Sequence, residues 1–94
     1  MDRLTGLRTE IDRIDDSILA MLAQRARLVG EVAVEKRARG LDPHQPARFA
    51  EMLARLHAQG AELGLDKPVI DAVWGAIHDA SVSWQEEQGA PNEP

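Results

Sequence analysis

The feature that most constrains the fold is a helical pattern of apolar residues between Leu4 and Lys36. Apolar residues recur there at steps of three, four or seven, which is the spacing of one face of an α-helix. They are Leu4, Leu7, Ile11, Ile14, Ile18, Leu22, Val29 and Val32. Acidic residues come early in this stretch and basic residues late, as the helix dipole prefers. The pattern predicts one helix of roughly 35 residues, about 50 Å long.

Proline and glycine residues divide the rest of the chain into two shorter helices. The first should span residues 46–63, with a proline in its first turn and Gly64 just after its end. The second should span residues 66–87, beginning at an aspartate that can cap it. Residues 88–94 are polar, with a glycine and two prolines, and we expect a disordered tail there. The chain thus predicts an all-α fold of three helices in a single domain, residues 1–94.

The unequal lengths of these helices predict a dimer. Helices of nearer 30 Å cannot cover the apolar face of one that is about 50 Å long. Two long helices that pair across a two-fold axis would bury that face. A chain of 94 residues also buries only a modest core, and oligomerisation is a common remedy. We therefore expect an intertwined homodimer.

Composition excludes several classes of protein and site. A net charge of −5 argues against a nucleic-acid-binding surface, and the lack of cysteine excludes disulfides and thiolate chemistry. No apolar run approaches the roughly 18 residues of a membrane span, and the N-terminus lacks a signal-peptide core. We expect a cytoplasmic protein that binds neither nucleic acid nor membrane. The histidines His44, His57 and His78 show no metal-ligand spacing, so we expect no metal and interpret each as a surface or packing residue.

Two cations, Arg25 and Lys36, interrupt the apolar face of the long helix. They are 36 − 25 = 11 residues apart, about three turns and roughly 16 Å along the axis. Buried positions rarely hold arginine or lysine unless an anion meets them. The alternative is that their stems lie on the core while the charged ends reach water. Because further polar partners follow in the chain, we favour an anion pocket between helices.

Three of these further partners lie in the two shorter helices. Arg48 falls in the first turn of the second helix, where its positive charge opposes the helix dipole. An anion bound by both Arg48 and the exposed backbone N–H groups would offset this cost. The alternative is that Arg48 is a solvated arginine. Ser81 and Gln85 are four residues apart and thus neighbours on one helix face, where they could also satisfy one another. The set contains cations and neutral hydrogen-bonding groups without a nucleophile. It suits a small dicarboxylate whose reaction needs positioning and electrostatic stabilisation.

Arg8 is the remaining candidate. It precedes Arg25 by 25 − 8 = 17 residues, which places it roughly 25 Å away along the helix. A small ligand held by Arg25 therefore cannot reach Arg8 of the same chain, but it could reach Arg8 of the partner subunit across a two-fold axis. The alternative is a surface ion pair with Asp12.

Three segments together resemble the all-helical class of chorismate mutase. They are LRTEIDRIDDSILAMLAQRARLVGEVAVEK, ARFAEML and GLDKPVIDAVWGAIHDASVSWQ, which cover nearly the whole chain. The opening LR-xx-ID-x-ID, the arginine of LAQR and the final lysine of the first segment occur together at the family spacing. The resemblance implies an intertwined dimer of three-helix chains with two shared active sites. It also implies the Claisen rearrangement of chorismate to prephenate, in phenylalanine and tyrosine biosynthesis, without a metal or cofactor.

The resemblance assigns roles to the residues already singled out. Arg25, together with Arg8 of the partner subunit, would bind the substrate carboxylates. Lys36 and Gln85 would hydrogen-bond the ether oxygen as its bond breaks and charge gathers there. The other substrate-binding residues that it implies are Arg48, which would assist the two arginines, and Ser81, which would lie near a carboxylate.

Two positions depart from the family pattern. The better-studied bacterial mutases have an acid directly after the arginine that matches Arg48, and another acid three residues before it. Here those positions hold Phe49 and Gln45, so the contact that those acids make with the ring hydroxyl is missing. Isochorismate pyruvate lyase and 4-amino-4-deoxychorismate mutase, related branches with an apolar residue there, are therefore alternatives. A non-catalytic helical dimerisation module is the third.

Overall fold

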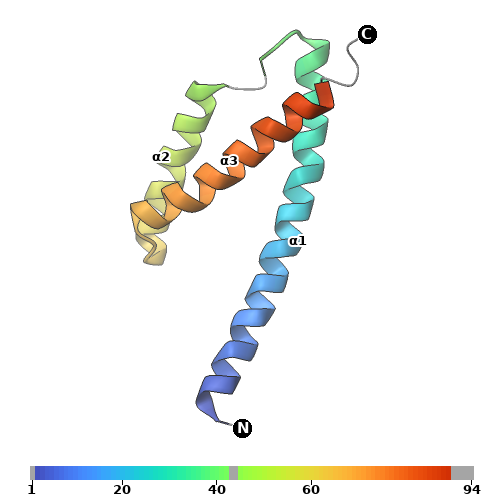
Figure 1. The fold of residues 1–94 in the computed structure, drawn as a ribbon. Coiled ribbons are helices and arrows are strands. Elements are labelled where there is room, and N and C mark those ends of the chain that lie inside the picture. Colours follow the sequence, from blue (N-terminus) through green and yellow to red (C-terminus); the bar gives the residue numbers. More distant parts are fainter. Residues whose placement is uncertain (1, 43–44, 90–94) are drawn as a thin grey trace.

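In the computed structural model, which describes residues 2–42 and 45–89, nearly all of the chain is helical (Figure 1). Helix α1 spans Arg3–Ala38, α2 spans Pro46–Leu63 and α3 spans Lys67–Gly89, and the described residues contain no strand. The prediction of one long and two shorter helices is confirmed. Helix α3 extends to Gly89, two residues beyond the predicted end at residue 87, and the rest of the tail predicted over residues 88–94 lies outside the described residues. Residues 88 and 89 can continue the helix because each keeps a backbone N–H, and the next proline after Pro68 is Pro91.

Local chemistry accounts for where the helices begin and end. The carboxylate of Asp2 caps α1 by accepting a hydrogen bond from the backbone N–H of Thr5, with N and O 2.8 Å apart. This bond lowers the pKa of Asp2 below its ordinary value. Gly40, with φ 67°, follows the end of α1, and Gly64, with φ 79°, ends α2. Both glycines adopt the left-handed backbone that side chains disfavour, and the prediction that Gly64 follows the end of the second helix is confirmed.

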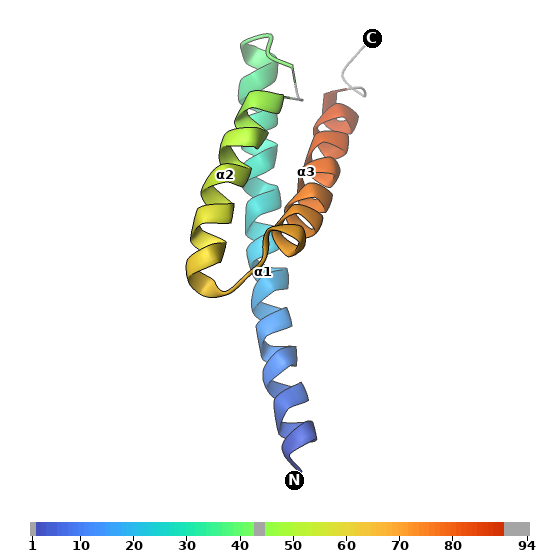
Figure 2. The same cartoon turned by 90° about the vertical axis from the view of Figure 1, so that its left-hand side faces the viewer.

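The two shorter helices leave half of α1 uncovered. Helix α3 packs against α2 and against the C-terminal half of α1, and Figures 1 and 2 both show the N-terminal half of α1 extending away alone. The molecule measures 59 × 27 × 16 Å as a result. The hairpin of α2 and α3 thus concentrates all packing between helices at one end of α1.

Few side chains are fully buried in a single chain. The buried apolar residues are Ala33, Met52 and Ile70. The residues of the predicted apolar face of α1 are instead between 38% and 59% exposed, apart from the half-buried Val29. No helix within the described residues is long and apolar enough to cross a membrane. The apolar face of α1 is therefore present but has no partner within one chain.

Two glycines allow helices to approach closely. A Cβ atom on Gly30 of α1 would lie 3.0 Å from Cη2 of Trp84 on α3. A Cβ atom on Gly60 of α2 would collide with Cδ1 of Ile70 and lie 3.2 Å from the carbonyl oxygen of Leu65. Gly60 therefore permits the tight turn between α2 and α3.

Gly60→Ala is expected to destabilise the fold by about 1–3 kcal/mol, because the added methyl group overpacks the α2–α3 turn. Gly75 provides a matched control. It also lies inside a helix, but a Cβ atom there would meet no described neighbour within 4 Å. Gly75→Ala should therefore stabilise the fold, by up to about 1 kcal/mol. Urea unfolding of both variants measures the difference, and equal midpoints would contradict the close approach at Gly60.

Candidate active site

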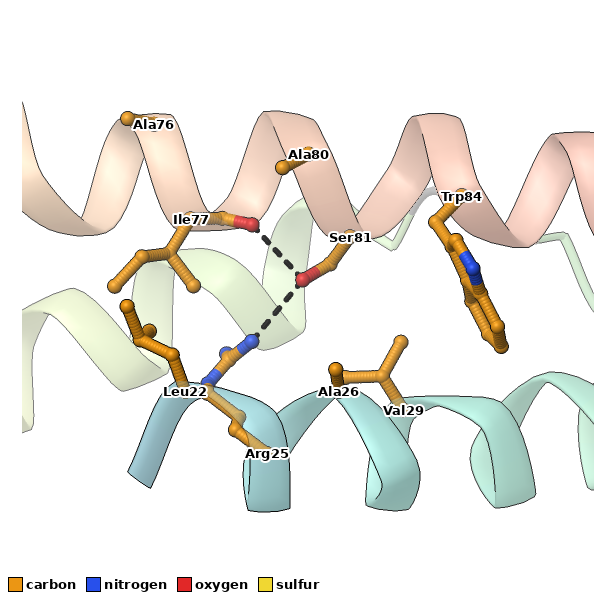
Figure 3. Close-up of a pocket in the computed structure, with 9 residues that line it drawn as sticks. All are labelled: Leu22, Arg25, Ala26, Val29, Ala76, Ile77, Ala80, Ser81 and Trp84. Atoms are coloured by element: carbon orange, nitrogen blue, oxygen red, sulfur yellow. Dashed lines mark hydrogen bonds between the residues drawn. The ribbon is translucent and has the colours of Figure 1, made fainter. Parts of the chain in front are cut away.

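A partly buried polar contact joins all three helices around Arg25. Its Nη1 atom donates a hydrogen bond to Oγ of Ser81 on α3 at 3.0 Å (Figure 3). The Ser81 hydroxyl in turn donates to the carbonyl oxygen of Ile77 at 2.8 Å. The Nη2 atom of Arg25 lies 4.0 Å from Sδ of Met52 on α2. The guanidinium is therefore held in place by neutral groups, and its charge is not neutralised by a carboxylate.

A second cation of α1 makes a similar contact further along α3. Nζ of Lys36 donates a hydrogen bond to Oε1 of Gln85 at 3.1 Å. Gln85 is only 8% exposed, and Lys36 is half-buried. Ser81 and Gln85 thus each accept from a cation of α1, and the alternative that they satisfy one another is wrong. With its carbonyl oxygen engaged by Lys36, the Gln85 side chain has its amide N–H groups to donate elsewhere.

These contacts line a pocket of about 120 Å³ where the three helices meet. Five of the six predicted site residues line it: Arg25, Lys36, Arg48, Ser81 and Gln85. Arg48 is exposed in the first turn of α2, where its charge adds to those of the other two cations. The described lining residues include three cations and no carboxylate. Such a pocket attracts a small anion, because cations in partly desolvated surroundings interact strongly with one.

Arg8 is the one predicted site residue that lies apart. It is exposed and belongs to the N-terminal half of α1. Figure 2 shows that this half of the helix extends away from α2 and α3. The ion pairs among the described residues do not include one between Arg8 and Asp12. Within a single chain Arg8 therefore does not line the pocket. It also does not form the ion pair with Asp12 that was the alternative interpretation.

Helical spacing alone did not single out His78, which also lines the pocket. Its ring stacks on that of Phe49, with centroids 3.9 Å apart and an angle of 19° between the planes. The signal was available, because His78 precedes Ser81 by three residues and Gln85 by seven and so shares their helix face. The stacking agrees with the interpretation of His78 as a packing residue, and its place in the pocket lining is what that interpretation left out.

The other histidines lie away from the site. His57 of α2 contacts Asp71 of α3 where these two helices pack together, with Nε2 and Oδ1 2.6 Å apart. His44 lies outside the described residues. Among residues 2–42 and 45–89, no three His, Asp or Glu side chains are grouped so that they could hold a metal ion.

A larger, apolar pocket of about 400 Å³ lies between α1 and α3 (Figure 3). Arg25 and Ser81 line it together with apolar side chains, among them Leu22 and Trp84. Leu22 also belongs to the uncovered apolar face of α1. The apolar pocket is therefore continuous with the surface of α1 that has no partner in one chain.

Residues 7–86 match the family model described as chorismate mutase type II. The chain belongs to this family. The chorismate mutase type II family is the all-helical class, so the fold class and the resemblance inferred from the sequence are both confirmed. The matched segment contains all six predicted site residues, from Arg8 to Gln85.

Curated relatives of this chorismate mutase type II chain are much longer. It is 35% identical over 86 residues to the T-protein of Enterobacter agglomerans, across 92% of this chain and 23% of that protein. It is 36% identical over 74 residues to the bifunctional chorismate mutase/prephenate dehydratase of Aquifex aeolicus, across 79% of this chain and 19% of that protein. The T-protein of Haemophilus influenzae is 32% identical over 73 residues, which are 19% of its length. The chain thus spans between 19% and 23% of these relatives.

Proposed function

We propose that the chain is a chorismate mutase that converts chorismate to prephenate. The observation that carries this proposal is the pocket in which three cations converge with Ser81 and Gln85, in a chain of the chorismate mutase type II family. Chorismate is a dicarboxylate with an ether link to its ring. Its rearrangement breaks the ether C–O bond and forms a C–C bond within one molecule, without gain or loss of a proton. A site without a nucleophile or an acid–base pair suits this reaction, which needs only positioning and charge stabilisation.

The contacts within the pocket favour a division of roles. Arg25, anchored by Ser81 and aided by Arg48, would bind the carboxylates, because a guanidinium matches a carboxylate in both charge and geometry. Lys36 and the amide N–H of Gln85 would donate to the ether oxygen. The hydrogen bond from Lys36 to the Gln85 carbonyl oxygen supports this role, since it orients the amide toward donation.

We also propose a homodimer with two shared active sites, each completed by Arg8 of the partner subunit. The support is the exposed apolar face of α1, which an antiparallel copy of α1 would cover. Arg8 lies roughly 25 Å from Arg25 along the helix, so it can serve a small substrate only across such an interface.

The proposed place of the reaction is phenylalanine and tyrosine biosynthesis in the cytoplasm. The support is the name of the Aquifex aeolicus relative, which joins a chorismate mutase to a prephenate dehydratase.

Phe49 and Gln45 favour a second candidate function. Both line the pocket at positions where the resemblance leads us to expect acids. The alternatives are therefore isochorismate pyruvate lyase and 4-amino-4-deoxychorismate mutase, which would use the same cations on related dicarboxylates.

The test compares chorismate, isochorismate and 4-amino-4-deoxychorismate with the purified chain, with and without EDTA. We expect the highest kcat/KM with chorismate, prephenate as its product, and the same rate in EDTA. Faster release of pyruvate from isochorismate would favour the lyase. No turnover of any of the three, together with no stabilisation of the fold by them, would favour a non-catalytic dimerisation module.

Gln85→Glu is expected to be active at acid pH and to lose activity as the pH rises. The amide of Gln85 donates at any pH, whereas a carboxyl group donates only while it is protonated. Lys36, whose Nζ lies 3.1 Å from Oε1 of Gln85, would favour the ionised carboxylate and so confine activity to acid solution. The measurement is kcat against pH for both proteins. Parallel profiles would remove Gln85 from the role at the ether oxygen.

A further inference from the structure

The indole of Trp84 spans the gap between α3 and α1. Figure 3 shows it reaching from α3 toward α1, beside Val29. A Cβ atom on Gly30 would lie 3.0 Å from Cη2 of the indole, 3.5 Å from Cζ3 and 4.0 Å from Cζ2. These are outer atoms of the six-membered ring, so the indole points its far edge at the backbone of α1. Because the ring is rigid, it sets how closely the two helices approach at this point.

This contact lies between the two hydrogen bonds that join α1 to α3. On α1 the glycine lies 30 − 25 = 5 residues after Arg25 and 36 − 30 = 6 residues before Lys36. On α3 the tryptophan follows Ser81 by 84 − 81 = 3 residues and directly precedes Gln85. The two hydrogen bonds measure 3.0 Å and 3.1 Å, which are ordinary lengths. A change in the distance between the helices at the ring would therefore alter both hydrogen bonds together.

We propose that Gly30 and Trp84 are positioning residues for the rearrangement. The indole sets the distance between α1 and α3, and the missing side chain at the glycine leaves room for the edge of the ring. Neither residue lines the pocket in which the three cations converge, so the pair acts through Lys36 and Gln85. Such donors must be held within about 0.5 Å of the productive geometry. This inference rests on the proposed function and adds two residues that the proposed mechanism does not use.

Gly30→Ala is expected to lower kcat for chorismate by about tenfold, with a smaller change in KM. The new methyl group would lie 3.0 Å from the ring, closer than the roughly 3.5–4.0 Å of ordinary carbon contacts, so the ring and α3 must move away. A misplacement of about 1 Å can cost roughly 100-fold in rate, and a fraction of that shift costs correspondingly less. The midpoint of urea unfolding should change little, because the higher helix propensity of alanine offsets the crowding.

Trp84→Phe is the compensating change, because phenylalanine lacks the outer ring atoms that would meet the new methyl group. The double variant Gly30→Ala/Trp84→Phe should have a kcat about fivefold or more above that of Gly30→Ala, a coupling of the size expected for residues in contact. Trp84→Phe alone should lower kcat by about fivefold, because the shorter ring no longer holds α3 at its distance from Gly30.

The experiment measures kcat, KM and urea unfolding for wild type, the two single variants, the double variant and Gly75→Ala. Gly75 is the matched control, because it lies inside α3 and a Cβ atom there would meet no described neighbour within 4 Å. Gly75→Ala should keep wild-type kcat. Trp84 also lines the apolar pocket beside the uncovered face of α1, so native mass spectrometry must show the same assembly for every protein compared.

The outcomes separate this inference from the proposed function. A loss of kcat in Gly30→Ala that Trp84→Phe restores supports the positioning role. A loss that Trp84→Phe does not restore overturns it, because the effect would then not pass through the indole. An unchanged kcat in Gly30→Ala also overturns it and leaves mutase activity standing. If Gly30→Ala does not fold, an unchanged kcat in Trp84→Phe alone overturns it. Failure of wild type to convert chorismate contradicts the proposed function itself.

Discussion

Lys36→Ala is expected to lower kcat for the rearrangement by about 100- to 1000-fold, while KM changes far less. The breaking ether bond leaves partial negative charge on oxygen. A cation placed there stabilises the transition state more than the ground state, and only that difference raises kcat. The loss of one preorganised donor costs roughly 3–4 kcal/mol in such sites. Lys36 also orients the buried Gln85 side chain, so its removal weakens both donors.

Steady-state kinetics with chorismate measure this effect, and the chain offers a matched control. Lys67 is exposed at the start of α3 and does not line the pocket. Lys67→Ala should therefore retain wild-type kcat and KM. A rise in KM for Lys36→Ala with kcat unchanged would show that Lys36 only binds the substrate.

Arg25→Ala and Arg8→Ala are each expected to lose most activity. Removal of one partner from a buried, hydrogen-bonded charge pair costs about 2–5 kcal/mol, which is roughly 30- to 5000-fold in kcat/KM. Arg25→Ala also removes the hydrogen bond to Ser81 and the contact with Met52, so its thermal unfolding must be measured alongside. Arg8 makes no such contact within the chain and is exposed, so Arg8→Ala should lose activity without a loss of subunit stability. Arg13, exposed on the same half of α1, supplies the control variant Arg13→Ala.

The helix bounds were predictable because local chemistry sets them. Pro46, Gly40 and Gly64 act through backbone geometry that does not depend on distant contacts, and α2 spans the predicted residues 46–63. The convergence of Arg25 and Lys36 on α3 was predictable for a related reason. Their place on the apolar face of α1 directs them toward α3, where Ser81 and Gln85 recur at helical spacing.

The parts of the site that depend on how α2 meets α3 were not predictable from helical spacing. The stack of Phe49 on His78 joins residues 78 − 49 = 29 positions apart on two helices, and no local pattern fixes that pairing. The close approach at Gly60 likewise depends on where the Ile70 side chain falls after the turn. The periodicity of α1 showed which face is apolar, but half of that face packs on nothing within the chain.

The measurement that tests the central claim most directly is the activity of mixed dimers of Arg8→Ala and Arg25→Ala. If each site takes Arg25 from one chain and Arg8 from the other, a mixed dimer has one native site and one site that lacks both arginines. Each heterodimer should then recover about half of wild-type activity, although either variant alone is nearly inactive. Heterodimers that form, as shown by native mass spectrometry, but remain inactive would contradict an active site shared between two chains.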